Sequence, residues 1–454
     1  MQTKKSAQGE WSSRWTFILA ATGAAVGLGN IWKFPYVAGQ SGGGAFVLFY
    51  LLCVLLVGIP LLMAEITIGR WGRQNPIHAI QTIAKEAKRS KYWSLVGGLC
   101  LFTGFLILSY YSVIAGWSIE YVFKSALGEF SGATVLSSIG IFHRLTSNLW
   151  QMLFWHTVIM LSTGYVIARG IELGIEKAVR FMFPIMILII ILLIGYAMST
   201  DKFTYAMAWL FEPDFSELTP NVMLEALGQA FFSLSIALGT IMTYGAYLPH
   251  KSSITSVSTA IAIADTAIAL LAGVAIFPIV FSYHLTPSAG PGLIFQSLPL
   301  AFAHMPLGRL FGTLFFIMLV FTAFTSTISL LEPTVVWLVE RFTWSRLKAS
   351  CIAISAVWLM GLITIFSFNI WSHVRLFGQT LFGCLDYLTA NIMLPLGGLL
   401  IAIFIAWKVP ENLFHAELRP EKKIIYQGFK FTMRYIVPIA IILIFLQVTG
   451  LLKW

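Results

Sequence analysis

The stretch GAAVGLGNIWKFP, residues 23–35, lies inside the first long apolar run of the chain and is a poor sequence for an unbroken helix. Glycine costs about 1 kcal/mol relative to alanine in a helix interior, and a lysine at the centre of a membrane helix costs roughly 2.5–3.5 kcal/mol. Irregular backbone at membrane depth is tolerated only where it is buried in protein or lines a cavity. We therefore predict a broken membrane helix whose freed carbonyl and amide groups bind an ion and a small ligand. A glycine-rich packing face is the alternative, but it leaves Asn30 and Lys33 unexplained.

The composition around this stretch is that of a polytopic membrane protein. The 454 residues are 58% hydrophobic and 11% charged, against about 25% charged in soluble domains. A membrane helix needs about 20 apolar residues. The sequence offers eleven candidate spans, at 14–38, 43–69, 92–124, 150–168, 174–199, 221–247, 255–282, 306–340, 347–367, 382–407 and 431–452.

The net charge of +10 is distributed by topology and does not indicate a nucleic-acid partner. If the N-terminus is cytoplasmic, most basic residues fall in inner segments, and the outer segments hold only Lys33, Lys124, Arg144, Lys202, Arg309, Arg375 and Lys453. This is the positive-inside pattern. Eleven spans then place the C-terminus outside, and the short loops favour a prokaryotic inner (cell) membrane. The four cysteines lie in or near predicted spans, so we expect neither a disulfide nor a transition-metal site.

A second interrupted helix follows five spans after the first. The run GQAFFSLSIALGTIMTYGAY, residues 228–247, mixes polar residues and glycines into an apolar segment. Two interrupted segments in corresponding positions of two halves indicate an inverted-repeat transporter with its site at the midplane. We expect a cytoplasmic tail at 1–13, a first five-helix repeat at 14–199, a second repeat at 221–407 and an eleventh helix at 431–452. A short surface helix is expected in the basic loop 70–91.

Isolated polar residues in other spans support a buried site, although each has an ordinary alternative. Asp265 in the seventh span is a functional candidate, because an intramembrane carboxylate is costly. Glu65 should approach the broken part of the first helix, or else lie at the inner interface. Tyr111 could be a packing residue, and Thr325 could bond back to its own helix.

The same residues form a suitable set of ligands for a hard cation. Sodium prefers oxygen ligands, and the sequence supplies Asn30, Ser233, Asp265, Thr325 and Ser326 in addition to freed carbonyls. No phosphate loop, nucleotide signature or supported nucleophile triad is visible. An enzyme is therefore not expected, and a channel would need polar residues along the whole pore rather than at one depth.

The motifs themselves resemble a known family. WSSRWTFILAATGAAVGLGNIWKFPYVAGQSGGGAF, followed by GIPLLMAEITIGRWG, resembles the neurotransmitter:sodium symporter family, and FTAFTSTISLLEP is similar to its eighth helix. The resemblance covers about residues 8–407. It implies an all-α polytopic membrane protein with the LeuT-type fold, which is also a standard example of broken transporter helices: a 5+5 inverted repeat with broken helices 1 and 6 and about 11 transmembrane helices. Members carry amino acids or amines inward with sodium, by alternating access.

The resemblance also implies the site residues. The first sodium site would use Ala25, Asn30, Ser233 and Asp265, and the second would use Gly23, Val26, Thr322, Thr325 and Ser326. Substrate would contact Ala24, Ala25, Leu28, Gly29, Ile107, Tyr111, Phe232, Ser233, Ser235, Leu238, Ser326 and Leu330. Lys33 and Asp386 would form the outer gate, Trp11, Tyr247 and Glu340 parts of the cytoplasmic gate, and Gly174 with Pro184 the part of helix 5 that unwinds.

Three departures from the family pattern, and two residues that bear on the substrate, refine this expectation. Lys33 replaces the usual arginine and lacks its bidentate fork. Asp265 stands where many relatives have asparagine, and its negative charge should make chloride unnecessary. Gln8 stands where the tail usually has a basic residue, which Lys4 or Lys5 could replace. Amine carriers place an aspartate at the position of Gly27, so this chain favours an amino acid, and Leu238 leaves room for an apolar or aromatic side chain. A betaine or amine carrier, or a non-transporting sensor of the same fold, is the alternative.

Overall fold

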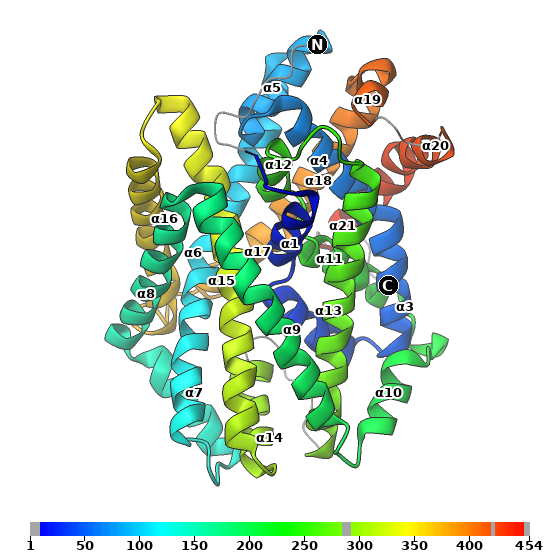
Figure 1. The fold of residues 1–454 in the computed structure, drawn as a ribbon. Coiled ribbons are helices and arrows are strands. Elements are labelled where there is room, and N and C mark those ends of the chain that lie inside the picture. The colour runs from blue at the N-terminus through cyan, green and yellow to red at the C-terminus, as the bar shows by residue number, and fades with distance from the viewer. Residues whose placement is uncertain (1–9, 284–291, 419–422, 449–454) are drawn as a thin grey trace.

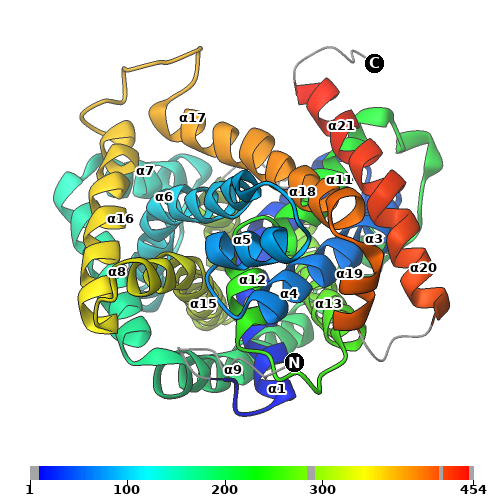
Figure 2. The same ribbon diagram turned by 90° about the horizontal axis from the view of Figure 1, so that it is seen from above.

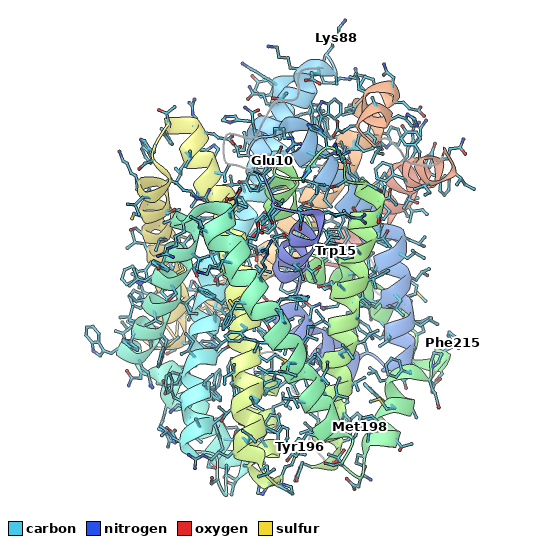
Figure 3. All side chains as sticks on the ribbon, in the orientation of Figure 1. Glu10, Trp15, Lys88, Tyr196, Met198 and Phe215 are labelled. Atoms are coloured by element: carbon cyan, nitrogen blue, oxygen red, sulfur yellow. The ribbon has the colours of Figure 1, made fainter. Side chains whose placement is uncertain are left out.

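The computed structural model describes residues 10–283, 292–418 and 423–448, and every regular element within these ranges is helical. Figure 1 shows the helices as a bundle whose long members run between two ends, with α1 near the middle. The tail and α5 (Pro76–Glu86) lie at one end, which we call the tail end. Figure 3 places Glu10 and Lys88 toward that end and Tyr196 and Met198 toward the other, which we call the vestibule end.

Within the described residues, nine helical runs are long and apolar enough to cross a membrane. They are α3–η2–α4 (Gly44–Gly72), η3–α6 (Lys91–Leu127), α8 (Leu149–Ala168), η4–α9 (Ile171–Ala197), α13 (Ile254–Ser282), α15 (Gly308–Phe342), α16 (Arg346–Phe368), α17–η7–α18–η8 (Leu381–Lys408) and α20–η9–α21 (Ile424–Gln447). These runs match nine of the expected spans. The last begins earlier than residue 431, and the end of its predicted range, 449–452, lies outside the described residues.

The first predicted break is present. Helix α1 (Arg14–Ala25) begins at Ser13, whose hydroxyl accepts from the Thr16 amide, and ends where Val26 adopts an extended ψ of 103°. The chain resumes as η1 (Gly29–Lys33) and α2 (Phe34–Gln40), and the two halves are bent by 54°. Together they form a tenth span. The glycines and Asn30 therefore interrupt the helix, as the sequence predicts.

The second predicted break divides α11 (Pro220–Ser233) from α12 (Thr240–Ala246), and neither half is long enough to cross alone. Ser235 and Ala237 have φ values of 51° and 62°, and Gly239 follows at 75°. A left-handed conformation costs a residue with a Cβ roughly 1–2 kcal/mol. Such strain persists only where the surroundings over-determine it, which is typical of ligand sites.

The two broken spans lie in the interior of the bundle. Figure 2, seen from the tail end, shows α12 between α4, α5 and α15, with α16 and α21 at opposite edges. Helices α4 and α12 touch closely, because a Cβ on Gly69 would lie 1.9 Å from the Met242 carbonyl oxygen. The irregular backbone is thus shielded from lipid by the regular helices, as its unpaired polar groups require.

The remaining helices lie outside the spans and cover the two ends. The expected surface helix in loop 70–91 is confirmed as α5, while α19 (Glu411–Glu417) lies at the same end. Helices α7 (Val135–Ser147), α10 (Phe203–Phe211) and α14 (Leu298–His304) lie at the vestibule end. The division into repeats at 14–199 and 221–407 stays a prediction, although both predicted repeats open with a broken helix.

Candidate functional site

A carboxylate joins the two broken helices at the middle of the bundle. Asp265 of α13 is fully buried, and its Oδ1 accepts from Asn30 Nδ2 at 2.8 Å while its Oδ2 accepts from Ser233 Oγ at 2.6 Å. Asn30 Oδ1 in turn accepts from the Gly27 amide at 3.1 Å. A buried carboxylate without a cationic partner within this cluster is costly. Its oxygens, with those of Asn30 and Ser233, form a coherent donor set for a hard cation.

A second group of oxygens lies between α1 and α15. Ser326 Oγ is 3.4 Å from the Val26 carbonyl oxygen and 3.2 Å from that of Thr322. Thr325 Oγ1 donates to the Thr322 carbonyl at 3.0 Å. A Cβ on Gly23 would lie 3.8 Å from Thr325 Cβ, so that glycine faces the same place. The residues predicted for a second ion site therefore lie close together, although the site itself stays a prediction.

A small cavity lies beside these two groups. Its volume is about 30 Å³, too small for an amino acid. All of the predicted substrate contacts except Ser233 line it: Ala24, Ala25, Leu28, Gly29, Ile107, Tyr111, Phe232, Ser235, Leu238, Ser326 and Leu330. Ser233 turns instead to Asp265 and Tyr50. Gly27 and Leu394 also line the cavity. Leu394 was missed because one leucine among many carries no signal in an apolar span.

Two hydrogen bonds join polar groups that line the cavity. The Leu28 amide donates to Tyr111 Oη at 3.0 Å, and Ser235 Oγ donates to the Ala24 carbonyl at 3.1 Å. The rest of the lining is mostly apolar, from Ile107, Leu238 and Leu330 among others.

Comparison with known proteins agrees with this geometry. Residues 8–138 and 129–453 match the sodium:neurotransmitter symporter family. The chain belongs to this family. It is 39% identical over 449 residues to an uncharacterized sodium-dependent transporter, YhdH of Bacillus subtilis, covering 98% of both chains. It is 30% identical over 300 residues to the sodium-dependent neutral amino acid transporter B(0)AT3 of Mus musculus, covering 60% of this chain and 47% of that one.

A solved structure of a related symporter has the same fold. The crystal structure of MhsT in complex with L-phenylalanine matches with a TM-score of 0.90 and 38% identity, and the match covers 97% of this chain and 100% of that one. The all-helical LeuT-type fold predicted from the sequence is confirmed. The chain is therefore a sodium-dependent transporter of the membrane, and its family is one of transporters rather than enzymes.

At the vestibule end, two side chains lie between the central cavity and a second cavity. Phe232 lines both the central cavity and a larger one of about 420 Å³ outside it, and Leu394 is shared in the same way. Lys33 Nζ lies 4.1 Å from the centroid of the Phe232 ring. No ion pair within 4.0 Å joins Lys33 to Asp386 among the described residues. In this conformation the expected outer gate residues, Lys33 and Asp386, are therefore not in direct contact. The Lys33 ammonium lies over the Phe232 ring instead.

At the tail end, the symporter is closed by several layers. Trp11 is buried and packs edge-on against Tyr244 and Tyr247, and its Nε1 donates to the Tyr244 carbonyl at 3.1 Å. Tyr247 Oη donates to Glu332 Oε1 at 3.1 Å, and Glu332 is paired with Arg346. The carboxylate bonded to Tyr247 is thus Glu332.

Glu340, predicted as another part of the cytoplasmic gate, contacts a different element. It accepts from the Asn75 amide at 3.0 Å and lies 3.3 Å from His78 Nδ1, so it ties α15 to the start of α5. Gln8, Lys4 and Lys5 lie outside the described residues. A tail charge that is described, Glu10, lies 3.3 Å from Arg73 at the end of α4. In this contact the acidic residue is on the tail and the basic residue is at the end of α4. The family usually has a basic residue on the tail.

Two further sequence predictions meet different local structures. Glu65 is fully buried and accepts from the Ala237 amide at 2.6 Å, so its hydrogen bond supports the break in the second span and not the first. This corrects both sequence-based placements, because α4 packs on α12.

Gly174 lies in the π-helical segment η4 (Ile171–Glu176), and Pro184 lies inside α9 (Lys177–Ala197). The start of the fifth membrane span is thus helical, but as a π-helix rather than an α-helix.

Proposed function

We propose that this symporter carries an apolar or aromatic amino acid into the cell, coupled to sodium, by alternating access. The observation that supports the substrate class is the lining of the central cavity, which combines a few polar groups with a mostly apolar set of side chains. The Leu28 amide and the Tyr111 hydroxyl are placed to bind a carboxylate, since both can donate once they separate from each other. The carbonyl of Ala24 and the Ser235 hydroxyl suit an ammonium group.

The surroundings of Gly27 argue for a ligand that brings its own carboxylate. A Cβ there would lie 2.8 Å from Ser326 Oγ and 3.0 Å from Tyr111 Oη. Contacts of that length leave no space for an aspartate side chain without a shift of the neighbours. The substrate carboxylate would then lie next to the first sodium ion and be balanced by it.

Two sodium ions without chloride are the ion requirement that we propose. The first would be held by Asn30, Ser233, Asp265 and the Ala25 carbonyl, and the second by Thr325, Ser326 and the carbonyls of Gly23, Val26 and Thr322. Asp265 supplies a fixed negative charge beside the first ion, which removes the need for a mobile anion. The tail end would face the cytoplasm, in agreement with the distribution of basic residues.

The experiment is uptake into proteoliposomes from a mixture of labelled amino acids, with an inward sodium gradient and a matched potassium control. We expect sodium-dependent accumulation of one or a few apolar or aromatic amino acids. Asp265→Asn should then acquire a requirement for chloride. Chloride-dependent uptake by the natural protein would refute the anion proposal while leaving the substrate class intact.

Accumulation of a betaine or an amine, with no amino acid taken up, would replace the proposed substrate class. Sodium-dependent binding of an amino acid without any uptake would identify a sensor of the same fold. A folded protein is recognised in each case by its elution from size-exclusion chromatography before reconstitution.

A further inference from the structure

A buried carboxylate at the tail end has no part in the site described above. Glu176 is the last residue of η4 and is only 4% exposed. Its oxygens accept from the Ser12 amide at 3.4 Å and from the Ser12 hydroxyl, and it is paired with Arg180 one turn further along. Arg180 also donates to Ser12 Oγ at 2.8 Å, so three residues form one closed group.

This group connects the tail to η4 and α9, which form the fifth membrane span. Ser12 directly follows Trp11, whose amide donates to the Tyr247 carbonyl at 3.2 Å. Two consecutive tail residues are therefore bound to two different elements, Trp11 to α12 and Ser12 to η4. The tail cannot leave the first without pulling on the second.

Glu176 also lies on the way from the second ion site to the tail end. Val179, three residues later in α9, faces Gly23, since a Cβ on Gly23 would lie 3.5 Å from Val179 Cγ1. Residues three apart on a helix share a face. Glu176 is thus one turn nearer the tail end than the residue that covers the second ion site.

The segment that carries Glu176 is built to rearrange. η4 is a π-helix of six residues, a conformation that occurs mostly in short pieces at functional sites. It begins after Gly170, whose φ is 82°, and a Cβ on Gly174 would lie 2.0 Å from the Val166 carbonyl oxygen. In this structure the segment packs against α8 and contacts the tail through Ser12.

From this arrangement we propose that Glu176 is a positioning residue of the transport cycle, which holds η4 wound through Ser12 and so keeps the second sodium site closed toward the tail end. The inference rests on the proposed function, because it assigns a route of sodium release. Departure of the tail frees Glu176, η4 unwinds, and water reaches the ion from that side. The coupling explains how tail movement and ion release occur together.

The test compares Glu176→Gln with Glu172→Gln, which removes the same charge from an exposed position of the same segment. We expect Glu176→Gln to raise the half-saturating sodium concentration for substrate binding at least threefold, with substrate affinity at saturating sodium unchanged within twofold. Glu172→Gln should change neither quantity. A change in substrate affinity alone, or equal effects of the two variants, would overturn the proposal.

Ser12→Ala removes the hydroxyl from the exposed partner, so this variant keeps the test available if Glu176→Gln does not fold. It should raise the sodium requirement in the same direction. The double variant of Ser12→Ala and Glu176→Gln should raise the sodium requirement no more than Glu176→Gln alone, because both substitutions remove the same contact. Additive effects would show that Glu176 acts without the tail.

A readout independent of transport separates this inference from the proposed function. Hydrogen–deuterium exchange of residues 171–176 in purified protein should be slowed by sodium, and Glu176→Gln should abolish that protection. Without any amino-acid transport the proposed function fails, yet the exchange result still decides the role of Glu176. Normal transport with unchanged exchange in Glu176→Gln refutes the inference alone.

Discussion

At the tail end, the pathway is covered by Trp11, two tyrosines and the Glu332–Arg346 pair, whereas at the vestibule end little more than the ring of Phe232 and Leu394 separate two cavities. The tail-end groups are buried except for Arg346, which is partly buried, and they belong to or adjoin the tail, α12, α15 and α16. Phe232 is only partly buried and carries a lysine over its ring. We therefore expect one end to open by movement of helices and the other by rotation of a side chain.

The difference indicates which barrier is lower in this conformation. Breaking a buried ion pair leaves an uncompensated charge and costs several kcal/mol, whereas the partly buried cation–π contact between Lys33 and Phe232 should contribute only about 1 kcal/mol. We therefore expect the weaker barrier to lie at the vestibule end. Substitutions at the tail end should shift the conformational equilibrium much more than those at the vestibule end.

The largest effect is expected for Glu332→Gln. Arg346 would lose its buried partner, which costs about 3–5 kcal/mol, and the tail end should open. The reactivity of a reporter cysteine, introduced by Ala246→Cys after Cys351→Ser, should rise strongly and sodium-driven uptake should collapse. Tyr247→Phe is the control, because it removes only one hydrogen bond, worth about 1 kcal/mol. Equal effects of the two variants would mean that Arg346 does not depend on Glu332.

Trp11→Ala should have the next largest effect. Truncating a buried tryptophan costs about 3 kcal/mol, and here the loss falls on the closed state, because the tail leaves α12 when the end opens. The same reporter cysteine should become reactive, while Trp11→Phe should retain part of the protection. A reporter that stays unreactive in Trp11→Ala would show that the tail is not part of the barrier.

A smaller effect is expected for Phe232→Ala. Its removal joins the cavities of about 30 and 420 Å³, so the substrate should dissociate faster toward the vestibule. We expect the Kd of the substrate to rise about tenfold, or about 1.4 kcal/mol, without reactivity of the tail-end reporter. Phe232→Tyr keeps a ring and should bind nearly normally. Loss of closure at the tail end would contradict the separation of the two barriers.

The smallest effect is expected for Lys33→Gln, which removes the cation over the Phe232 ring. The loss of about 0.5–1 kcal/mol should raise the KM for uptake less than fivefold. Asp386→Asn should change the KM independently if the two residues are separated during most of the cycle. A large and identical loss in both variants would instead establish them as a permanent ion pair, and the vestibule end would then be as firmly closed as the tail end.

Local sequence was sufficient to predict the two breaks, whereas the residues proposed for the ion sites came from the family resemblance and stay a prediction. Asn30 and Asp265 were recognisable because a polar side chain is costly at membrane depth and must have a purpose there. Contacts between side chains on different helices were harder to predict. Glu65 was placed near the wrong break, and the partners of Glu340 were not predicted, because these contacts depend on how α4 packs on α12 and how α5 lies against α15. Leu394 was missed, because only the folded structure shows that this leucine, among many, lies between the two cavities.

The sequence by itself determined a membrane-embedded, all-helical transporter with two interrupted helices, since hydropathy and the cost of misplaced polar groups are properties of each segment alone. The tertiary structure decided which carboxylate bonds to Tyr247, where Lys33 lies and how Ser12 reaches Glu176. Those contacts join residues far apart in the chain, and their energies arise only when packing removes water from both partners. The unequal closure of the two ends follows from that packing.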